Sequence, residues 1–361
     1  MEHLPDDEGF TQRRKQDLGL TRPELAVLLS YSKIWLTRQL LASDLPEDPG
    51  FAGELMRYFP KAVGERYPTD IRKHRLRREI IATAVTNSLV NRMGPTFVGR
   101  ACAETGASAA DVARAWGIAR QVFGARDLWG AVESLDHRIP AAAQYAVLGD
   151  SARLLRHATV WLLRRRRDRL AVDAAVKEYT APIAQLRAAL PRVLAGASLE
   201  AFEAARARHV SAGVPTALAE TAAGLPMLDA ALEICEIARG AGLRVEDAAR
   251  AWSTASSALG LDRLEARIEG LAVDGPLQAT ARAGLRDALR STQARILTQL
   301  LSGGAGRGAR RGWEPRWQDW RTAQAARLED WQRTTREVFA LGNADFAALS
   351  VCVEALRSLA E

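Results

Sequence analysis

The apolar residues of this chain recur mainly at the three- and four-residue spacing of amphipathic helices, and the alternating pattern of strands is nearly absent. The first strong helical segment begins at Thr21, where Glu24 completes a capping-box pattern and Leu25 opens the apolar series. A proline-rich, acidic stretch at 44–50 ends it. Residues 3–7, in contrast, carry no capping pattern. The sequence therefore predicts an all-α fold, a multi-helical array with no Rossmann domain.

A second long helix is predicted over Ile71–Met93, with a buried stripe that starts at Leu76. Four polar residues, spaced four apart, lie beside this stripe. A line of this kind usually faces solvent, and the alternative is that it hydrogen-bonds to another helix or domain. Its members are Glu79, Thr83, Asn87 and Asn91. The same spacing predicts the remaining helices, which include Gly53–Phe59, Ser108–Phe123, Asp127–Leu135, Ala141–Arg169, Trp313–Ala340 and Ala344–Ala360.

Part of the pattern recurs at an offset of 136 residues without a gap. The matching residues include Gly106 and Gly242, Asp111 and Asp247, Trp116 and Trp252, and Gly124 and Gly260. Alanine-rich helices match easily by chance, but a shared tryptophan and two shared glycines are harder to obtain that way. We therefore predict two related helical modules in a tandem pseudo-repeat, with the two tryptophans as core anchors at equivalent places.

These patterns predict a division of the chain into five parts. Residues 1–20 are expected to be the stub of an upstream domain. The two related helical modules follow at 21–170 and 171–302. A Gly/Arg-rich loop at 303–312 then leads to the C-terminal helices at 313–361.

Composition limits the classes of function. The formal net charge is +7, and only five of the 50 basic residues are lysine. Such arginine dominance beside many alanines and glycines is typical of a GC-rich genome, so basicity is weak evidence for nucleic-acid binding. The isolated cysteines Cys102, Cys235 and Cys352 are expected to be buried thiols in a reducing cytoplasm. No apolar run reaches the ~18 residues of a membrane span, so we expect a cytoplasmic protein without a membrane partner.

Several segments resemble functional motifs. Gly304–Gly308 looks like a dinucleotide loop, but a leucine-rich helix precedes it where a strand is required. Arg164–Arg167 is either a solvated helix end or a contact for an acidic partner. Residues 307–320 mix arginine with tryptophan as single-strand binders do, but the helical spacing of the tryptophans favours packing on the helical body.

The basic cluster around His74 could support acid–base chemistry only with a partner in a cleft, and none can be identified. Within this cluster Glu79 is expected to pair with Arg75 or Arg78. No Cys/His grouping has metal-ligand spacing. We therefore predict no catalytic, cofactor-binding or metal-binding residue in this chain.

Six sequence strings resemble the C-terminal region of the large bacterial NAD-specific glutamate dehydrogenases, in matching order and spacing. They are Leu20–Leu29, Ser43–Pro46, Tyr58–Pro60, His74–Thr83, Asn87–Gly94 and Glu104–Ala107. The resemblance implies a role in the oxidation of L-glutamate with NAD to 2-oxoglutarate and ammonium. The family's dehydrogenase core, with its NAD-binding domain, precedes this region, so no catalytic or NAD-binding residue can be carried onto this chain.

On this resemblance, the chain is expected to support assembly or communication between subunits and to be inactive alone. Its partners would be the dehydrogenase core of the same enzyme or other subunits. The alternative, from the class of binding modules, is an arginine-rich helical scaffold that docks on an acidic protein or on nucleic acid, the nucleic acid being the less favoured of the two.

Overall fold

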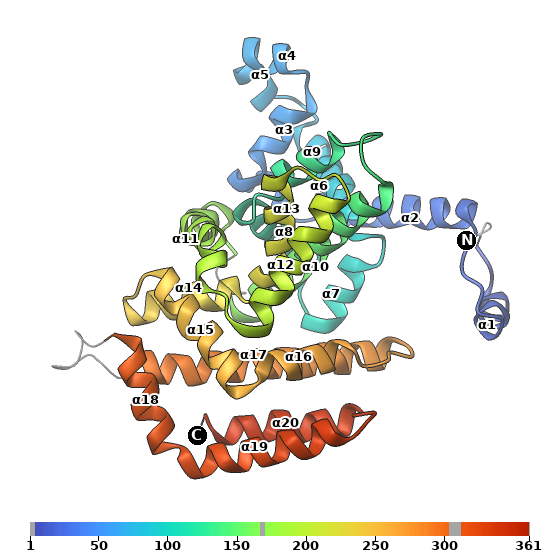
Figure 1. The fold of residues 1–361 in the computed structure, drawn as a ribbon. Coiled ribbons are helices and arrows are strands. Elements are labelled where there is room, and N and C mark those ends of the chain that lie inside the picture. Colours follow the sequence, from blue (N-terminus) through green and yellow to red (C-terminus); the bar gives the residue numbers. More distant parts are fainter. Residues whose placement is uncertain (1–3, 167–169, 303–311, 361) are drawn as a thin grey trace. The chain divides into compact units, whose positions relative to one another are not determined.

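A computed structural model describes residues 4–166, 170–302 and 312–360, and all regular structure in these ranges is helical (Figure 1). The predicted all-α fold is confirmed. The chain forms two compact units and crosses between them three times. The first unit consists of Met1–Asp127 and Ser151–Glu178, and the second of Leu128–Asp150 and Tyr179–Glu361. The five-part division derived from the sequence remains a prediction.

The first unit is built around α8, whose side chains are buried along almost its whole length. The helices α2 and α6 pack on it and on each other. Its helices are α1 (Asp7–Lys15), α2 (Arg22–Leu41), α3 (Ala52–Tyr58), α4 (Lys61–Arg66), α5 (Pro68–Arg72), α6 (Arg77–Met93), α7 (Phe97–Thr105) and α8 (Ala109–Val122), with 3-10 turns at Leu45–Glu47 and Pro49–Phe51. Three helices have residues in both units: α9 (Ala125–Glu133), α10 (Ala141–Arg165) and α11 (Val172–Val193).

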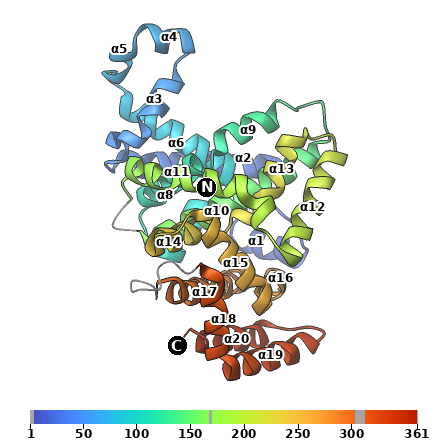
Figure 2. The same ribbon diagram turned by 60° about the vertical axis from the view of Figure 1, so that its left-hand side comes forward.

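The second unit has the long helix α17 at its centre, packed against α14, α15, α16 and α20. The antiparallel pair α19 and α20 lies side by side in both views (Figures 1 and 2). The helices of this unit are α12 (Gly196–Ser211), α13 (Thr216–Gly224), α14 (Ala231–Ala241), α15 (Val245–Leu259), α16 (Leu261–Glu269), α17 (Pro276–Ser302), α18 (Trp313–Ala323), α19 (Ala325–Ala340) and α20 (Phe346–Ser358).

Two expectations about helix boundaries and one about a buried residue are wrong. Residues 71–93 do not form one helix, because the chain turns after α5 and α6 begins only at Arg77. Leu76 lies in this turn and is 55% exposed, outside the buried stripe. Residues 313–340 divide at Gln324 into α18 and α19. In each case the apolar period continues across the turn, so periodicity alone could not locate the break.

The N-terminal segment does have a helix start. Asp6 is the N-cap of α1, and its side chain accepts a hydrogen bond from the Gly9 backbone nitrogen at 2.8 Å. The capping signal was missed because no apolar period follows it, and α1 has no buried residue. At the next helix the Thr21 signal is confirmed, since the Glu24 carboxylate accepts from the Thr21 backbone nitrogen at 2.7 Å.

The helices repeat with the predicted offset of 136 residues. The sequence α7–α8–α9 has the same order and nearly the same bounds as α14–α15–α16. Gly106 and Gly242 both end their first helix with positive φ, at 67° and 63°. Trp116 is fully buried, whereas Trp252 is only half-buried, so only the first of the two predicted anchors is a full core residue.

Replacing either of these C-cap glycines by alanine is expected to lower the free energy of unfolding by about 1–2 kcal/mol, because a Cβ is strained in the left-handed region. A Cβ at Gly106 or Gly242 would meet no atom within 4 Å, so backbone strain is the expected cost. Urea denaturation of Gly106→Ala and Gly242→Ala measures it. The matched control is Gly99→Ala inside α7, where open space and helical backbone predict a gain of up to about 1 kcal/mol.

Two of the three cysteines are buried, Cys235 and Cys352, and Cys102 is half-buried. Burial raises the pKa of Cys352 to about 11 and also raises that of Cys102. Thiols with raised pKa are poor nucleophiles and poor metal ligands at neutral pH. The expectation of buried structural thiols is confirmed for Cys235 and Cys352.

Candidate functional site

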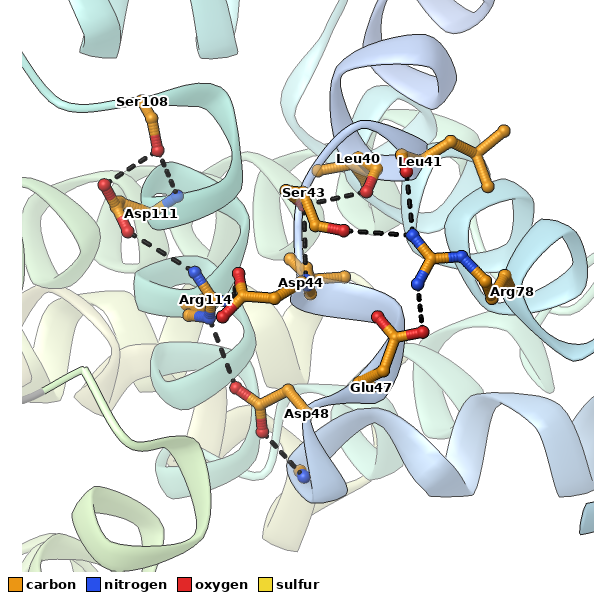
Figure 3. Close-up of polar contacts among 12 residues, drawn as sticks. Leu40, Leu41, Ser43, Asp44, Glu47, Asp48, Arg78, Ser108, Asp111 and Arg114 are labelled. Atoms are coloured by element: carbon orange, nitrogen blue, oxygen red, sulfur yellow. Dashed lines mark hydrogen bonds and ion pairs between the residues drawn. The ribbon is translucent and has the colours of Figure 1, made fainter.

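One polar site of the first unit surrounds the loop at residues 43–48, which carries one of the family-like strings (Figure 3). Leu45 and Pro46 are buried and anchor the loop on the core. Asp44, Glu47 and Asp48 face the opposite way, toward two arginines from different helices. We call these residues together the loop clamp.

Arg114 of α8 holds one side of the loop clamp. Its Nη2 donates to Asp44 Oδ1 at 2.5 Å and its Nε to Asp48 Oδ2 at 3.2 Å. The other Asp48 oxygen accepts from the Gly50 backbone nitrogen at 3.0 Å. The hydrogen bond from Arg114 lowers the pKa of Asp44, so the pair stays ionised at neutral pH. A single guanidinium thus orders both ends of an acidic turn.

Arg78 of α6 holds the other side. Its Nη2 donates to the backbone carbonyls of Leu41 at 2.8 Å and Ser43 at 3.1 Å, and its Nη1 pairs with Glu47. The carbonyls at the end of α2 would otherwise lack a partner in the helix. Of the two partners expected for Glu79, Arg75 and Arg78, the second is engaged elsewhere, because the Arg78 side chain turns toward residues more than thirty positions upstream.

Arg78→Lys is expected to lower the free energy of unfolding by about 1–2 kcal/mol, because an ammonium group cannot reproduce the planar fork that bonds two carbonyls and a carboxylate. Arg75→Lys is the matched control in the same basic cluster, and its side chain is exposed. Thermal and urea unfolding should place the control within about 0.5 kcal/mol of the parent. Equal effects at both positions would contradict the role given to Arg78.

A second polar site lies around Glu54 of α3, which is only 4% exposed. Glu54 Oε1 accepts from Arg120 Nη2 at 2.5 Å, from Arg126 Nη2 at 2.6 Å and from Arg57 Nη2 at 3.0 Å. Arg120 is 2% exposed, and its guanidinium lies 4.8 Å from the ring centre of Trp116. Three arginines on one carboxylate give the Glu54 cluster a net charge of +2.

Both Glu54 and Arg120 of the Glu54 cluster stay charged at neutral pH. Burial by itself raises the pKa of Glu54, but the charges of Arg120 and Arg126 outweigh it and lower the pKa to about 2. Burial lowers the pKa of Arg120 to about 10, which leaves it protonated at neutral pH. A general acid or base needs a pKa near the working pH, so this cluster is built for packing and not for proton transfer.

The lowered pKa of Glu54 predicts acid sensitivity. The stabilisation is fully present above the ordinary pKa of 4.5 and is lost as the pH falls toward 2, because the unfolded chain binds the proton more readily there. We therefore expect the midpoint urea concentration of unfolding to fall between pH 5 and pH 3 more steeply for the parent than for Glu54→Gln. Parallel curves for the two proteins would contradict this assignment.

The second unit has a comparable cluster at Arg290 of α17. Its Nη2 lies 2.5 Å from Glu265 Oε1 and 3.2 Å from Asp229 Oδ2. The Arg290 and Asp229 side chains are each 12% exposed. Like Arg114 and Arg120, Arg290 ties elements far apart in sequence. In both units these polar groups therefore tie together helices that are far apart in the sequence.

Among the described residues, the segments that resembled functional motifs in the sequence lie outside these three clusters, apart from Arg78 of the loop clamp, and make contacts of their own. His74 sits in the turn before α6, where its Nδ1 accepts from the Leu76 backbone nitrogen at 3.1 Å. Arg164 and Arg166 pair with Glu104 at 2.7 Å and Glu178 at 2.6 Å. Gly304–Gly308 and Arg167 lie outside the described residues.

The tryptophans near the C-terminus pack on the helical body, as their spacing indicated. Trp317 is 4% exposed and stacks on Trp320, with ring centres 5.2 Å apart. Trp331 is 2% exposed. Arg316 donates to the Leu301 carbonyl at 2.7 Å, which caps α17. The side chains of Trp317 and Trp331 are thus used inside the second unit.

A dinucleotide cofactor requires a strand followed by a glycine-rich turn and a helix N-terminus. The described residues contain no strand, and the glycine-rich segment is flanked by α17 and α18. The described residues therefore do not form a dinucleotide site of this kind. In the same described ranges no group of three His, Cys, Asp or Glu side chains could hold a metal ion, and no helix is long and apolar enough to cross a membrane.

Sequence reasoning missed Glu54, Arg114, Arg120 and Arg126. A signal existed for two of them: Arg114 and Arg120 occur in α8 among small and apolar residues, where an arginine is unexpected on a buried face. Apart from Asp111, which lies 3.5 Å from Arg114, the carboxylates that hold these arginines come from residues 44–54, so no local pattern could reveal those distant pairs.

Comparison with known proteins supports the family resemblance that the six sequence strings indicated, one of which lies in the loop clamp. The family model described as "Glutamate dehydrogenase, C-terminal" matches residues 17–358. The NAD-specific glutamate dehydrogenase of Halomonas elongata is 37% identical over 362 residues, and that of Pseudomonas aeruginosa 36% over 361. Each match covers 100% of this chain.

The enzyme of the same name from Mycobacterium tuberculosis is 30% identical over 99% of this chain. This chain spans 22% of the length of each of the three relatives. The family model covers most of the chain and carries the description of a C-terminal part. The chain therefore belongs to the glutamate dehydrogenase family, as a representative of its C-terminal region.

Proposed function

We propose that this chain is the C-terminal helical portion of a cytoplasmic NAD-dependent glutamate dehydrogenase of glutamate catabolism, with a structural role in assembly. The whole enzyme would convert L-glutamate and NAD to 2-oxoglutarate, ammonium and NADH. The observation that carries this proposal is the match along the whole chain to 22% of the length of two NAD-specific glutamate dehydrogenases. The described residues are helical throughout, which supports placing NAD binding in the other part of the enzyme.

The proposal is tested with the purified 361-residue chain, assayed for NADH production from L-glutamate and NAD. We expect no turnover above background. In a chimera, this chain replaces the region of the Pseudomonas aeruginosa enzyme that it matches, and the chimera is expected to turn over. Turnover by the isolated chain near that of an intact enzyme would overturn the assignment of a purely structural role.

The binding-module alternative makes a different prediction. An arginine-rich scaffold for nucleic acid would bind DNA or RNA with an affinity that falls steeply with salt. The internal pairing of Arg164, Arg166, Arg114 and Arg120 leaves fewer arginines for such a partner. Binding of a duplex or single strand at low salt would favour this alternative, and its absence would remove the nucleic-acid form of it.

A further inference from the structure

The helix α2 has apolar side chains on all sides, yet only Leu36 and Leu40 are buried. These two face α6 and the core of the first unit. At about 100° per residue, Ile34 lies about 160° around the helix from Leu36. Tyr31, Ile34 and Trp35 are 46%, 47% and 43% exposed. We call Tyr31, Ile34 and Trp35, with the half-buried Val27 and Leu28 beside them, the free face of α2.

A helix that is apolar on every side is typical of a position enclosed by other structure. The free face groups two aromatic rings with aliphatic side chains, the residue types enriched at the centres of protein interfaces. A solitary exposed apolar residue needs no explanation, but these five lie on one side of one helix within two and a half turns. The pattern indicates that a further surface, beyond the helices of the first unit, covers this side.

The neighbouring helix α1 independently indicates that a further surface packs on this part of the first unit. It has nine residues, none of them buried, and Phe10 is 42% exposed. An ion pair between Arg13 and Glu24, at 2.6 Å, ties it to the start of α2. Helices shorter than about 12 residues are marginal in water, so a helix of this kind needs a packing surface. An ion pair with α2 does not supply such a surface.

We propose that the free face of α2 is the docking surface of this region on the dehydrogenase portion of the enzyme, an inference that rests on the proposed function. In the relatives, the matched region makes up 22% of a polypeptide and bears the description of a C-terminal part. The remaining polypeptide therefore leads directly into the segment that corresponds to α1 and α2. Covalent connection gives it a high effective concentration at this face, which favours it over a second copy of the chain.

The occupant is accordingly an apolar surface of the preceding polypeptide. Arg38 is the exposed charge within the angular range of the free face, since it lies about 20° from Val27 and from Tyr31 around the helix. The surface of the dehydrogenase portion is therefore expected to offer an apolar patch with a carboxylate at its edge. Burying this face would also explain why α2 is apolar on two opposite sides, since each side then has a partner.

The chimera with the Pseudomonas aeruginosa enzyme tests this contact directly. A photoreactive residue is introduced as Ile34→benzoylphenylalanine, and the matched control is Tyr145→benzoylphenylalanine on α10, where the parent side chain is 71% exposed. After irradiation, position 34 is expected to crosslink to peptides from the dehydrogenase portion, and position 145 is not. Adding Tyr31→Glu should lower the equilibrium constant of the contact by about 30-fold, as for a central interface residue, and so lower the crosslinked yield.

Two results would overturn the proposal: no crosslink from position 34 above the control, or crosslinks only to peptides of the matched region, which would mean that the second unit of the same chain or a second copy covers the face. The same photoreactive residue in the isolated 361-residue chain separates these cases, because self-association would give concentration-dependent crosslinks there. NADH turnover of the unsubstituted chimera is read separately. Turnover without the crosslink refutes only the docking surface, and the crosslink without turnover refutes only the proposed function.

Discussion

Glu54→Gln is expected to lower the free energy of unfolding by about 3–5 kcal/mol, the largest effect of any single polar substitution in the first unit. The substitution keeps the shape of the side chain and an acceptor oxygen, but it removes the negative charge that offsets Arg120, Arg126 and Arg57. Arg126 and Arg57 are partly exposed and can turn to water. Arg120 cannot, because it is 2% exposed, and its Nε and Nη1 already have no partner among the described residues.

The matched control is Glu65→Gln, which removes a carboxylate that is 67% exposed and lies 3.7 Å from Lys61. Its expected cost is below about 1 kcal/mol, as for other exposed ion pairs. Urea denaturation followed by circular dichroism measures both. The double substitution Glu54→Leu with Arg120→Leu removes both buried charges and is expected to cost less than Glu54→Gln alone. A cost below about 1 kcal/mol for Glu54→Gln would show that the buried guanidinium finds compensation elsewhere.

Trp331→Ala is expected to destabilise the second unit by about 3–5 kcal/mol, because it deletes a large, fully packed ring. Trp331 is 2% exposed, and its Nε1 donates to the Leu259 carbonyl at 3.0 Å. This carbonyl lies at the C-terminus of α15, where helix carbonyls lack intrahelical partners. The indole therefore fills the core and caps a helix at the same time.

Two further variants separate these contributions. Trp331→Phe keeps most of the apolar contact and loses the hydrogen bond, so we expect a smaller loss of about 1–2 kcal/mol. Trp35→Ala makes the same change as Trp331→Ala at a side chain that is 43% exposed, and it is expected to stay within about 0.5–1 kcal/mol of the parent in the isolated chain. Hydrogen exchange and urea unfolding report the change in each unit. Equal losses for Trp331→Ala and Trp35→Ala would contradict the packing described.

Local signals predicted the helices well where a cap and an apolar period coincide. Ser108 is the N-cap of α8, and its Oγ accepts from the Asp111 backbone nitrogen at 3.1 Å, as the spacing indicated. The prediction failed where one of the two signals was missing. At α1 the cap exists without an apolar period, and between α5 and α6 the period continues without a helix. Both failures arise because periodicity reports burial, whereas a cap or a break depends on backbone hydrogen bonds.

The sequence by itself determined that this chain is all-helical, that a helical segment recurs after 136 residues, and that its strings resemble the C-terminal region of one dehydrogenase family. These properties depend on side-chain spacing and local capping, which are readable along the chain. Only the tertiary structure decided that Arg78 and Arg114 clamp the 43–48 loop, that Glu54 joins three arginines, and that one side of α2 stays uncovered. Charge pairing and burial depend on which distant segments of the chain meet. The packing of the core decides which segments meet, and the local sequence does not.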